Sequence, residues 1–365
     1  MDYDVIVVGC GPAGASAAYF NAEAGRKVLL IEKADFPRDK ICGDGVTGKS
    51  LGILHEMGLN AEIAGIKEIS CDSVLLSSPN QTMLTIPISS PDDPLTAFCI
   101  ERLLFDNVLY ERAVESVVAN GGTLLKEKVS GVVVESDAVT GVRVKDKTYS
   151  AKLVVGADGF NGPVSRHVMG ETQQPKQNRN HYSSAVREYW EGIKGSEGQI
   201  EIHFIKGILP GYFWIFPLSD KRFNIGVGML LADMDNQSVK LKEMLDWVVN
   251  ESFLADRFSD AKAIPNTRKG WMLPMGSPRG LSLNPRKNFV KGCVLVGDSA
   301  SLIDPFTGEG IGNALVSGKL TVKYPVIDEV TGIEYQTELW EMIGEELTNS
   351  HRLQKMLKRH RLMNF

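Results

Sequence analysis

The chain has 365 residues, of which 43% are hydrophobic and 23% are charged, with a formal net charge of −5. This composition is typical of a globular protein with one large domain or two, and the acidic balance argues against a nucleic-acid partner. The five cysteines are scattered and include no CxxC pair, so we expect neither a disulfide framework nor a metal site. No apolar run is long enough to cross a membrane, and the start lacks a signal-peptide pattern, so we expect a cytoplasmic location.

The first residues of the chain predict a βαβ unit that binds a dinucleotide. An apolar run at 4–8 ends in a GxGxxG pattern, a helix of small residues follows, and a second apolar run ends at Glu32. We expect Gly9 to allow the turn, Gly11 to let the backbone approach a pyrophosphate, and Gly14 to bring the helix close to the sheet. The Glu32 carboxylate suits ribose hydroxyls and repels a ribose phosphate, which favours FAD or NAD over NADP.

Two styles of element alternate along the rest of the chain. Short buried-type strands and amphipathic helices, typical of a parallel nucleotide-binding sheet, are predicted at 49–58, 101–120, 129–135, 141–144, 153–156, 294–298 and from about 309. Alternating strands, typical of one antiparallel sheet, are predicted within 70–97 and at 183–189, 199–205, 212–217 and 223–229, before a helix near 238–250. We therefore predict a discontinuous nucleotide-binding domain (1–69, 98–170 and 286–325), an inserted substrate domain (70–97 and 171–285) and a C-terminal helical segment (326–365).

Three further motifs point to the ligand. Arg102 begins a helix, where a cation is disfavoured unless an anion such as a pyrophosphate lies nearby. Asp158 and Asp298 each follow an apolar strand, where ligands bind in open α/β sheets, and Asp298 can accept a hydrogen bond from a ribityl hydroxyl. Pro305 and the glycines of 308–312 then open a helix whose N–H groups suit the N1 and C2=O side of a flavin. A solvated arginine and a plain Asp-Gly turn are the local alternatives for Arg102 and Asp158.

Together these motifs resemble the flavoprotein monooxygenase fold of p-hydroxybenzoate hydroxylase. The resemblance covers nearly the whole chain and implies an α/β fold with an added antiparallel β-sheet. In such a fold a FAD-binding, Rossmann-like βαβ domain carries an inserted β-sheet substrate domain, and the substrate lies between the flavin and that sheet. With the residues above, the resemblance places the FAD site at Gly9, Gly11, Ala13, Gly14, Glu32, Lys33, Cys42, Gly43, Arg102, Val129, Asp158, Asp298, Gly308, Gly310 and Ile311.

Two motifs narrow the resemblance to the geranylgeranyl reductase family, whose members reduce isolated double bonds of prenyl chains with reduced FAD. They are the C-G-D-G run that begins at Cys42 and the Y-x-W-x-F-P pattern that ends at Pro217. In a strand, Tyr212, Trp214 and Phe216 share one face. That apolar wall binds a prenyl chain or an aromatic ring, or it is ordinary sheet core. We expect these three residues and Pro217 to contact the substrate.

The proton donor for such a reduction does not stand out in the sequence, and Cys42 and Tyr212 are our catalytic candidates. A thiol in the position of Cys42 could equally tune or protect the reduced flavin, or serve as a small residue in a tight turn. We expect an apolar prenyl or aromatic substrate. Because the chain has no second βαβ fingerprint, transient NAD(P)H and a reduced ferredoxin both remain as electron donors.

Two other functions use the same scaffold or part of it. Flavin-dependent halogenases carry W-x-W-x-I-P, and here Tyr212 and Phe216 replace the first tryptophan and the isoleucine. The alternative reading is therefore an aromatic monooxygenase or halogenase that acts through a flavin hydroperoxide. A non-enzymatic electron carrier is the third, and it predicts no enclosed cavity beside the flavin.

The last residues of the chain form a basic stretch. Residues 351–365 include five Lys or Arg and no acid, and Leu353, Met356 and Leu357 are expected on one helical face. Such a helix suits a peripheral contact with the inner face of an anionic membrane. A terminal helix packed on the body of the protein is the alternative.

Overall fold

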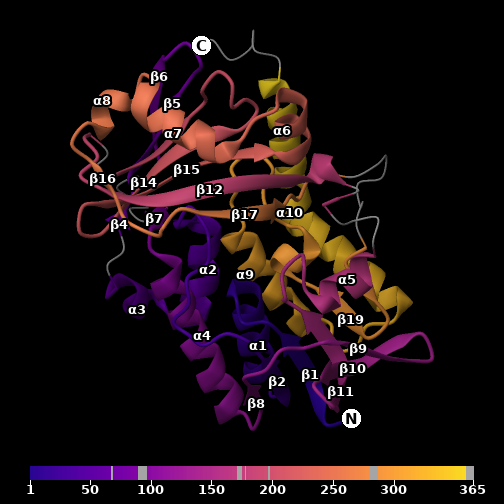
Figure 1. The fold of residues 1–365 in the computed structure, drawn as a ribbon. Helices are drawn as coiled ribbons and strands as arrows, with labels where there is room; N and C mark the ends of the chain where they lie inside the picture. Colours follow the sequence, from indigo (N-terminus) through magenta and orange to yellow (C-terminus); the bar gives the residue numbers. More distant parts are fainter. Residues whose placement is uncertain are drawn as a thin grey trace.

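The protein contains two large β-sheets, one above the other in Figure 1, with a long C-terminal helix running beside both. The computed structural model describes residues 1–66, 69–88, 97–170, 175–176, 178–195, 198–278 and 287–358. The lower sheet contains the N-terminal βαβ unit, and the upper sheet contains the aromatic strand of the Y-x-W-x-F-P pattern.

The lower sheet has the strand order β18-β19-β11-β1-β2-β8. These strands are β1 (Tyr3–Val8), β2 (Val28–Ile31), β8 (Thr123–Leu125), β11 (Lys147–Gly156), β18 (Phe289–Val290) and β19 (Cys293–Leu295). Two more, β9 (Gly131–Glu135) and β10 (Ala138–Val144), continue from β11 as an antiparallel ribbon. Because β2, β1, β11 and β19 pair in parallel, their carboxyl ends meet at one edge, which faces the upper sheet. Ligands bind at such an edge in open α/β sheets.

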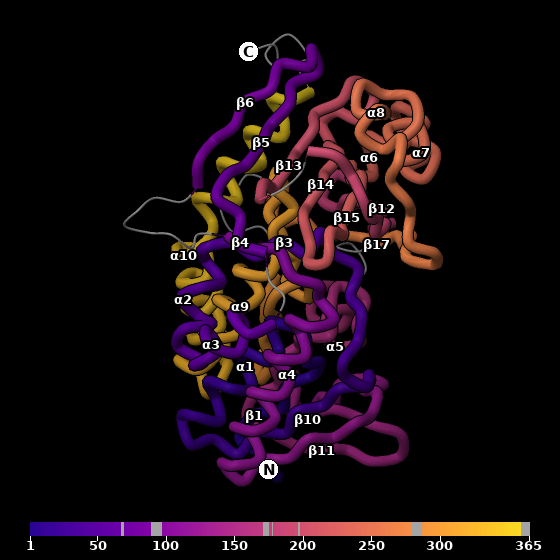
Figure 2. The backbone as a smooth tube through the Cα atoms, turned by 90° about the vertical axis from the view of Figure 1, so that its left-hand side faces the viewer, coloured from indigo at the N-terminus to yellow at the C-terminus, as the bar shows by residue number. Residues whose placement is uncertain are grey.

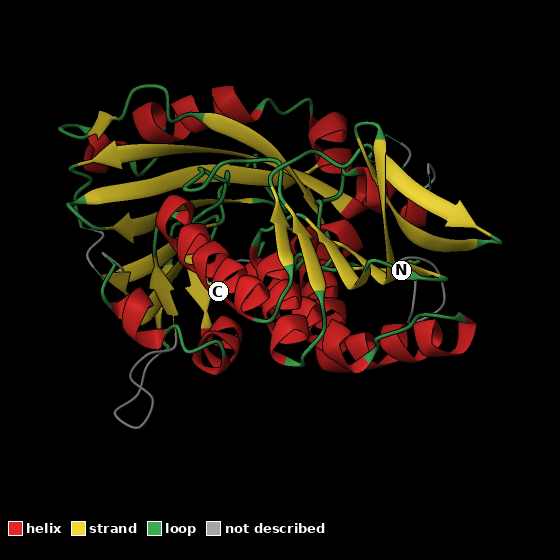
Figure 3. Cartoon of the chain, turned by 90° about the horizontal axis from the view of Figure 1, so that it is seen from below, coloured by secondary structure: helices red, strands yellow, loops and turns green. Residues whose placement is uncertain are grey.

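The lower sheet is covered by helices that pack closely on one another (Figure 3). Helix α1 (Pro12–Glu23) contacts both α4 (Arg102–Ala119) and α9 (Ile311–Leu320). This packing depends on small side chains, since Ala15, Ala17 and Ala18 are fully buried in the core. Apolar strand residues such as Ile6 and Leu29 fill the other side of this core, as expected for strands that are covered on both faces.

The upper sheet has the order β16-β12-β15-β14-β13-β5-β6, with β17 also paired to β12. Its strands are β5 (Ser73–Ser77), β6 (Met83–Pro87), β12 (Tyr182–Glu191), β13 (Gln199–His203), β14 (Tyr212–Leu218), β15 (Arg222–Leu230), β16 (Lys262–Ala263) and β17 (Lys269–Pro274). One face packs on α6 (Leu231–Gln237), α7 (Leu241–Glu251) and α8 (Ala255–Phe258), through a core that includes Ile215, Val227 and Leu245. The other face borders the space between the two sheets.

Smaller elements join the two sheets. A three-stranded sheet consists of β3 (Gly45–Thr47), β7 (Ala97–Cys99) and β4 (Ile69–Ser70), and α2 (Gly48–Glu56) and α3 (Asn60–Ala64) follow β3 in the chain. Helix α5 (Pro163–Met169) contacts β9 and β19 of the lower sheet. Single 3₁₀ turns are η2 (Arg179–His181), η3 (Gly297–Ala300) and η4 (Thr321–Lys323). Helix α10 (Glu329–Leu357) starts at a capping box on Asp328. Its Tyr335 lies in the core of the lower sheet and its Leu357 packs against Phe204 of the upper one, so α10 ties both together.

Two expectations from the sequence were wrong, and one was incomplete. The upper sheet is mixed rather than purely antiparallel, because β5 pairs in parallel with β13. The helix expected near 238–250 is α7, and a shorter helix that was not expected, α6, precedes it across a left-handed turn at Ser238. Leu353, Met356 and Leu357 do not share one environment, since Leu357 is buried and the other two are exposed. Residues 359–365 of the basic stretch lie outside the described residues.

Candidate active site

A cavity of about 1050 Å³ lies between the carboxyl edge of the lower sheet and the open face of the upper sheet. Its size is at the upper end of the range for small-molecule sites, which is roughly 300–1,000 Å³. It is lined by all but two of the residues expected to contact FAD or substrate. The two exceptions are Gly14 and Pro217, which are buried beneath the lining.

The glycines of the first turn let the protein backbone pack closely there and leave it open to contact by a ligand. Gly9 has a φ of +96°, and a side chain there would come within 2.4 Å of the Ala157 carbonyl oxygen. A side chain on Gly14 would come within 1.8 Å of the Gly9 carbonyl oxygen, so Gly14 acts by letting α1 reach the turn. Gly11 lines the cavity, and a side chain there would meet only the end of Arg38, at 3.5 Å. The start of α1 is thus open toward the cavity, where a phosphate would meet backbone N–H groups.

Glu32 stands at the end of β2 and borders the same end of the cavity. Its two carboxylate oxygens accept hydrogen bonds from the backbone N–H groups of Cys10 (2.7 Å) and Ala34 (2.8 Å). These bonds fix the carboxylate at the place where the sequence predicts a ribose. Lys33 also lines the cavity but is exposed, as expected for a residue just beyond the strand.

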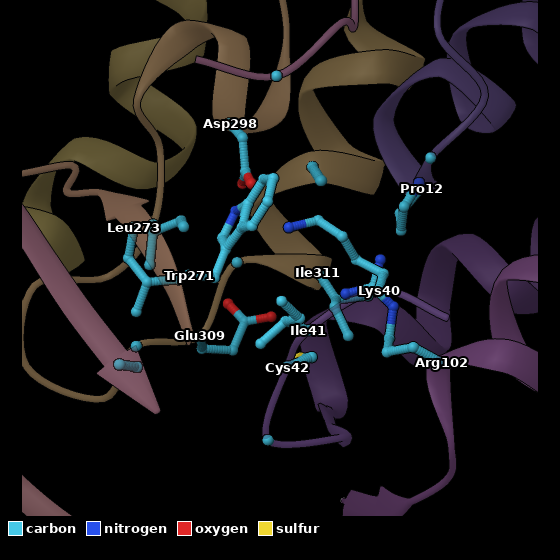
Figure 4. A pocket seen from close by; sticks show the side chains of 18 of the residues that line it. Pro12, Lys40, Ile41, Cys42, Arg102, Trp271, Leu273, Asp298, Glu309 and Ile311 are labelled. Carbon is cyan, nitrogen blue, oxygen red and sulfur yellow. The ribbon is translucent and has the colours of Figure 1, made fainter. Parts of the chain in front are cut away.

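Asp158 and Asp298 follow neighbouring strands, as the sequence predicted, but they differ in their surroundings. The oxygens of Asp158 accept hydrogen bonds from the N–H groups of Val164 (2.7 Å) and Ser165 (3.3 Å), which tie the strand end to α5. Burial raises the pKa of Asp158 to about 6, against these hydrogen bonds. Asp298 directs its carboxylate into the cavity, as Figure 4 shows. Val129, from the loop before β9, also lines this part of the cavity.

Arg102 lines the cavity, but its guanidinium has a protein partner. It pairs with Asp106 one turn further along α4, through bonds of 2.6 and 2.8 Å, and Arg38 approaches the same carboxylate at 3.3 Å. The sequence explained a cation at this helix start by a bound pyrophosphate. The i, i+4 pair with the buried Asp106 explains it without any ligand.

The C-G-D-G loop is fastened to the upper sheet by a buried asparagine. The Asn224 amide donates to the Cys42 carbonyl oxygen and to an Asp44 carboxylate oxygen, each at 2.7 Å, and accepts from the Trp214 indole N–H at 3.0 Å. Asp44, with a φ of +68°, also accepts from the Tyr189 hydroxyl at 2.8 Å. Burial raises the pKa of Asp44 to about 6. Sequence reasoning missed Asn224, although an asparagine inside an otherwise apolar strand is a signal for such a buried contact.

The aromatic face of β14 forms one wall of the cavity, beside the C-G-D-G loop. Tyr212, Trp214 and Phe216 all line it, and Phe216 lies so close to Gly43 that a side chain there would come within 3.1 Å of the ring. Pro217 points to the other face of the sheet, as strand alternation requires, so the expected contact of Pro217 with substrate is wrong. The Tyr212 hydroxyl donates to the Thr307 carbonyl oxygen, and burial raises its pKa.

Lys40 and Trp271 contact each other in the cavity, and no sequence pattern indicated this contact. The Lys40 ammonium lies 4.2 Å from the centroid of the Trp271 indole, from the loop after β2 and from β17 respectively (Figure 4). Burial lowers the pKa of Lys40, with the Asp298 carboxylate acting in the opposite direction. A cation over an indole face is held by the negative face of the ring. The pair therefore places a positive charge in the part of the cavity that contains the Asp298 carboxylate.

The start of α9 forms the last side of the cavity. Gly308, Gly310 and Ile311 line it, and the Glu309 carboxylate points into it in Figure 4. One Glu309 oxygen accepts a hydrogen bond from the Gly312 N–H at 2.6 Å. Burial raises the pKa of Glu309 above its ordinary value. The sequence pointed to the glycines of this turn but assigned Glu309 no role.

The lining as a whole fits FAD at one end and an apolar molecule at the other. The Gly9 turn, the fixed Glu32 carboxylate and the start of α9 offer a diphosphate, a ribose and a flavin ring the groups they need. The far end, toward β5, β6 and β13, is aliphatic and is lined by Val74, Leu76, Ile86, Ile88, Ile200 and Ile202. Among the residues that the structure describes, no cluster of His, Cys, Asp and Glu could hold a metal ion.

Comparisons with known families give two matches along the chain. The model of the FAD binding domain matches residues 2–205, and that of the geranylgeranyl reductase catalytic domain matches residues 181–266. The first covers the lower sheet except β18 and β19, together with part of the upper one, and the second covers β12 to β16 with the aromatic strand.

Individual proteins agree with these matches. The chain is 31% identical to a menaquinone reductase of Mycolicibacterium smegmatis, covering 90% of this chain and 77% of that one. It is 32% identical to a digeranylgeranylglycerophospholipid reductase of Methanosarcina acetivorans, covering 87% and 74%. A geranylgeranyl bacteriochlorophyll reductase-like structure from Thermoplasma acidophilum superposes with a TM-score of 0.78 at 25% identity, over 98% of this chain and 90% of that one. A flavin-dependent brominase, with a TM-score of 0.72 at 21% identity over 94% and 83%, shares the fold.

Proposed function

This chain belongs to the geranylgeranyl reductase family of FAD-dependent oxidoreductases, and we propose on that basis that it reduces carbon–carbon double bonds of a prenyl lipid. One observation carries the proposal. A single cavity joins the dinucleotide turn of the lower sheet to the aromatic wall and aliphatic far end of the upper sheet. A long apolar chain can therefore lie along the upper sheet with part of its length beside the flavin position. The relatives named for menaquinone and for geranylgeranyl lipids support a prenyl substrate.

Bound FAD would supply the hydride, and the protein would supply binding and orientation. Glu32 and the Gly9 turn would hold the nucleotide half, and Asp298 with the start of α9 would hold the ribityl and flavin half. The aromatic wall would fix the alkene against the flavin and exclude water from it. Asn224 is hydrogen-bonded to both the Cys42 loop and the Trp214 indole, so it holds these two parts of the cavity wall at a fixed separation.

The test is anaerobic turnover of the FAD-loaded protein. The protein is reduced with dithionite and mixed with a geranylgeranyl phospholipid or with a saturated-chain control lipid. We expect the flavin to reoxidise only with the unsaturated lipid, and the product to gain two hydrogen atoms for each bond reduced. Reoxidation that needs oxygen, with hydroxylation or halogenation of an aromatic compound, would instead establish the monooxygenase or halogenase reading.

We further propose that the electrons come from transient NAD(P)H or from a reduced ferredoxin. Lys33 and Lys128 line the cavity and are exposed, and their positive charges suit either an anionic nucleotide or an acidic protein. Anaerobic bleaching of the bound flavin by NADH, NADPH or reduced ferredoxin, each at low and high salt, identifies the donor. No bleaching by any of the three would contradict this proposal.

The structure also favours a lipid-facing surface at the apolar end of the cavity. On β6, Met83, Leu84 and Ile86 are 51%, 48% and 40% exposed, and on the end of α10, Leu353 and Met356 are 46% and 49% exposed. The two segments lie at the same end of the molecule in Figures 1 and 2, and Leu76 of β5 packs in the same cluster as Leu357 of α10. Among the described residues, no helix is long and apolar enough to span a bilayer. We propose that this surface rests on an anionic bilayer and admits the prenyl chain.

Sedimentation with lipid vesicles tests the surface. Leu84→Asp and Met356→Asp should each reduce binding to anionic vesicles, because a carboxylate cannot enter the acyl region at low cost. Val118→Asp is the matched control, since Val118 is an exposed valine on α4, in the lower layer. Equal binding of all three variants and the wild type would refute this contact.

A further inference from the structure

The reduction of an alkene needs a proton as well as a hydride, and the source of that proton is the open question of this site. Tyr212, a candidate from the sequence, is poorly suited to the task. Its hydroxyl proton is directed to the Thr307 carbonyl oxygen, and burial raises its pKa, so it is a weaker acid than a free tyrosine. A better donor would be an acid that lines the cavity, stays protonated near neutral pH and is not fully engaged elsewhere.

Most carboxylates in the cavity lining are engaged by other groups. Both oxygens of Glu32 accept backbone N–H bonds, and so do both oxygens of Asp158. Asp39 is paired with the cations of Arg187 and Lys269 at 2.7 and 2.8 Å. These carboxylates therefore hold structure together, and proton transfer from them would break it.

Glu309 differs in position and in bonding. One of its oxygens accepts from the Gly312 N–H, and among the described residues the other has no hydrogen-bond partner. Figure 4 shows its carboxylate directed into the cavity, on the same side as Ile41 and Cys42, whereas Asp298 lies at the opposite end. Glu309 follows Gly308, which touches the Tyr212 hydroxyl closely enough that a side chain there would come within 3.0 Å. The carboxyl group is thus next to the aromatic wall along which the substrate would lie.

The surroundings of Glu309 favour its protonated form before the reaction and tolerate its charge afterwards. Burial raises its pKa, while the Gly312 N–H and the Lys49 ammonium act in the opposite direction. The Lys49 ammonium is fixed by Asn313 at 2.8 Å and by Glu346 at 2.5 Å. Negative charge on a reduced flavin at the start of α9 would raise the pKa of Glu309 further. A shift in this direction favours the form that can donate a proton.

We propose that Glu309 is the general acid of this enzyme, which donates the proton to one alkene carbon while the other receives the hydride. This inference rests on the proposed function. The C=C π bond, the O–H bond of Glu309 and the N–H bond of the reduced flavin that would supply the hydride break, and two C–H bonds form. The alkene gains two electrons from the reduced flavin, which is oxidised by two. The Glu309 carboxylate keeps its bond from Gly312 and regains a proton from water at the cavity mouth.

The central test is Glu309→Gln, which keeps the size of the side chain and an oxygen to accept from Gly312 but removes the acid. FAD affinity, measured by quenching of flavin fluorescence, should stay within about threefold of the wild type. Reoxidation of the reduced flavin by a geranylgeranyl lipid in a single turnover should fall by roughly 10²–10⁴-fold. Glu309→Asp, which restores an acid on a shorter side chain, should recover part of the rate. Glu346→Gln is the matched control, because Glu346 also contacts Lys49 but lies outside the cavity lining.

A second readout does not depend on turnover. Infrared difference spectra between the reduced and oxidised FAD-loaded protein should show a protonated carboxyl band in the wild type that is absent from Glu309→Gln. A Glu309→Gln variant with wild-type single-turnover rate would refute the acid role alone. In that case, loss of rate in Cys42→Ala would assign the proton to the thiol. A wild-type protein that reduces no prenyl lipid would refute the proposed function and this inference with it.

Discussion

Replacing Asn224 by alanine should detach the Cys42 loop from the upper sheet. Asn224 is fully buried, and both the nitrogen and the oxygen of its side-chain amide form hydrogen bonds. It donates to the Cys42 carbonyl oxygen and to Asp44, and it accepts from the Trp214 indole. Alanine provides none of these bonds, so the loop and the indole would lose the residue that sets their separation.

The size of the effect follows from the groups left behind. A buried polar group without a partner costs about 1–3 kcal/mol. The Cys42 carbonyl and the Trp214 indole N–H would each lose their bond to Asn224, whereas Asp44 would keep the Tyr189 hydroxyl. The expected loss is therefore about 2–6 kcal/mol, less whatever a water molecule in the vacated space restores. That is a large part of the usual 5–15 kcal/mol of a folded domain.

Urea unfolding and thiol alkylation measure the two consequences separately. The unfolding midpoint should fall, and Cys42 should react at least about tenfold faster with iodoacetamide below the unfolding transition, since loop opening becomes easier. The four other cysteines are buried, so the reaction reports on Cys42. Asn21→Ala is the control, because Asn21 is equally buried and donates to Ala17 and Thr321 at 2.8 Å, away from the cavity. The reasoning is refuted if Asn224→Ala alkylates no faster than Asn21→Ala.

Three further outcomes are expected. Gly14→Ala should abolish FAD binding in a fluorescence titration, because its methyl group would come within 1.8 Å of the Gly9 carbonyl oxygen, while Gly52→Ala, where the space is open, should bind normally. Glu32→Ala should weaken FAD binding by roughly 10–100-fold in the same titration, the equivalent of one or two charge-assisted hydrogen bonds, and an unchanged affinity would remove Glu32 from the ribose site. Burial raises the pKa of Asp44 to about 6 from 3.8, so its contribution to stability is present below the lower value and is lost as the pH rises through the higher one. In Asp44→Asn this pH-dependent loss of unfolding free energy, on the order of 3 kcal/mol, should be absent. Urea midpoints of the wild type and of Asp44→Asn that change in parallel between about pH 4.5 and pH 7 would contradict this prediction.

The parts of the fold that the sequence predicted are those coded by local patterns. The βαβ start, the strands β12, β14 and β15, and the helix that became α4 all follow from the spacing of apolar residues over one short segment. The positions of Asp158 and Asp298 were predictable for a related reason. Each follows a strand in the same parallel sheet, so topology alone brings them to one edge.

The contacts that the sequence did not reveal join residues far apart in the chain. Lys40 and Cys42 lie in the loop after β2, whereas their partners Trp271 and Asn224 lie in the upper sheet, so no spacing rule connects them. The parallel pairing of β5 with β13 is missed for the same reason. The pair of Arg102 with Asp106 is an exception, since its i, i+4 spacing was readable, but the ligand explanation was preferred.

The pairing of β5 with β13 limits which fragments of the chain can be expressed in folded form. A fragment that ends near residue 170 would contain the dinucleotide turn and also β5, but the strand that completes β5 would be absent. Five residues, from Ser73 to Ser77, would then present unpaired backbone groups along one edge, which invites association with other chains. Expression of the N-terminal half alone should thus yield aggregates, and a soluble fragment would require removal of the β5–β6 hairpin as well.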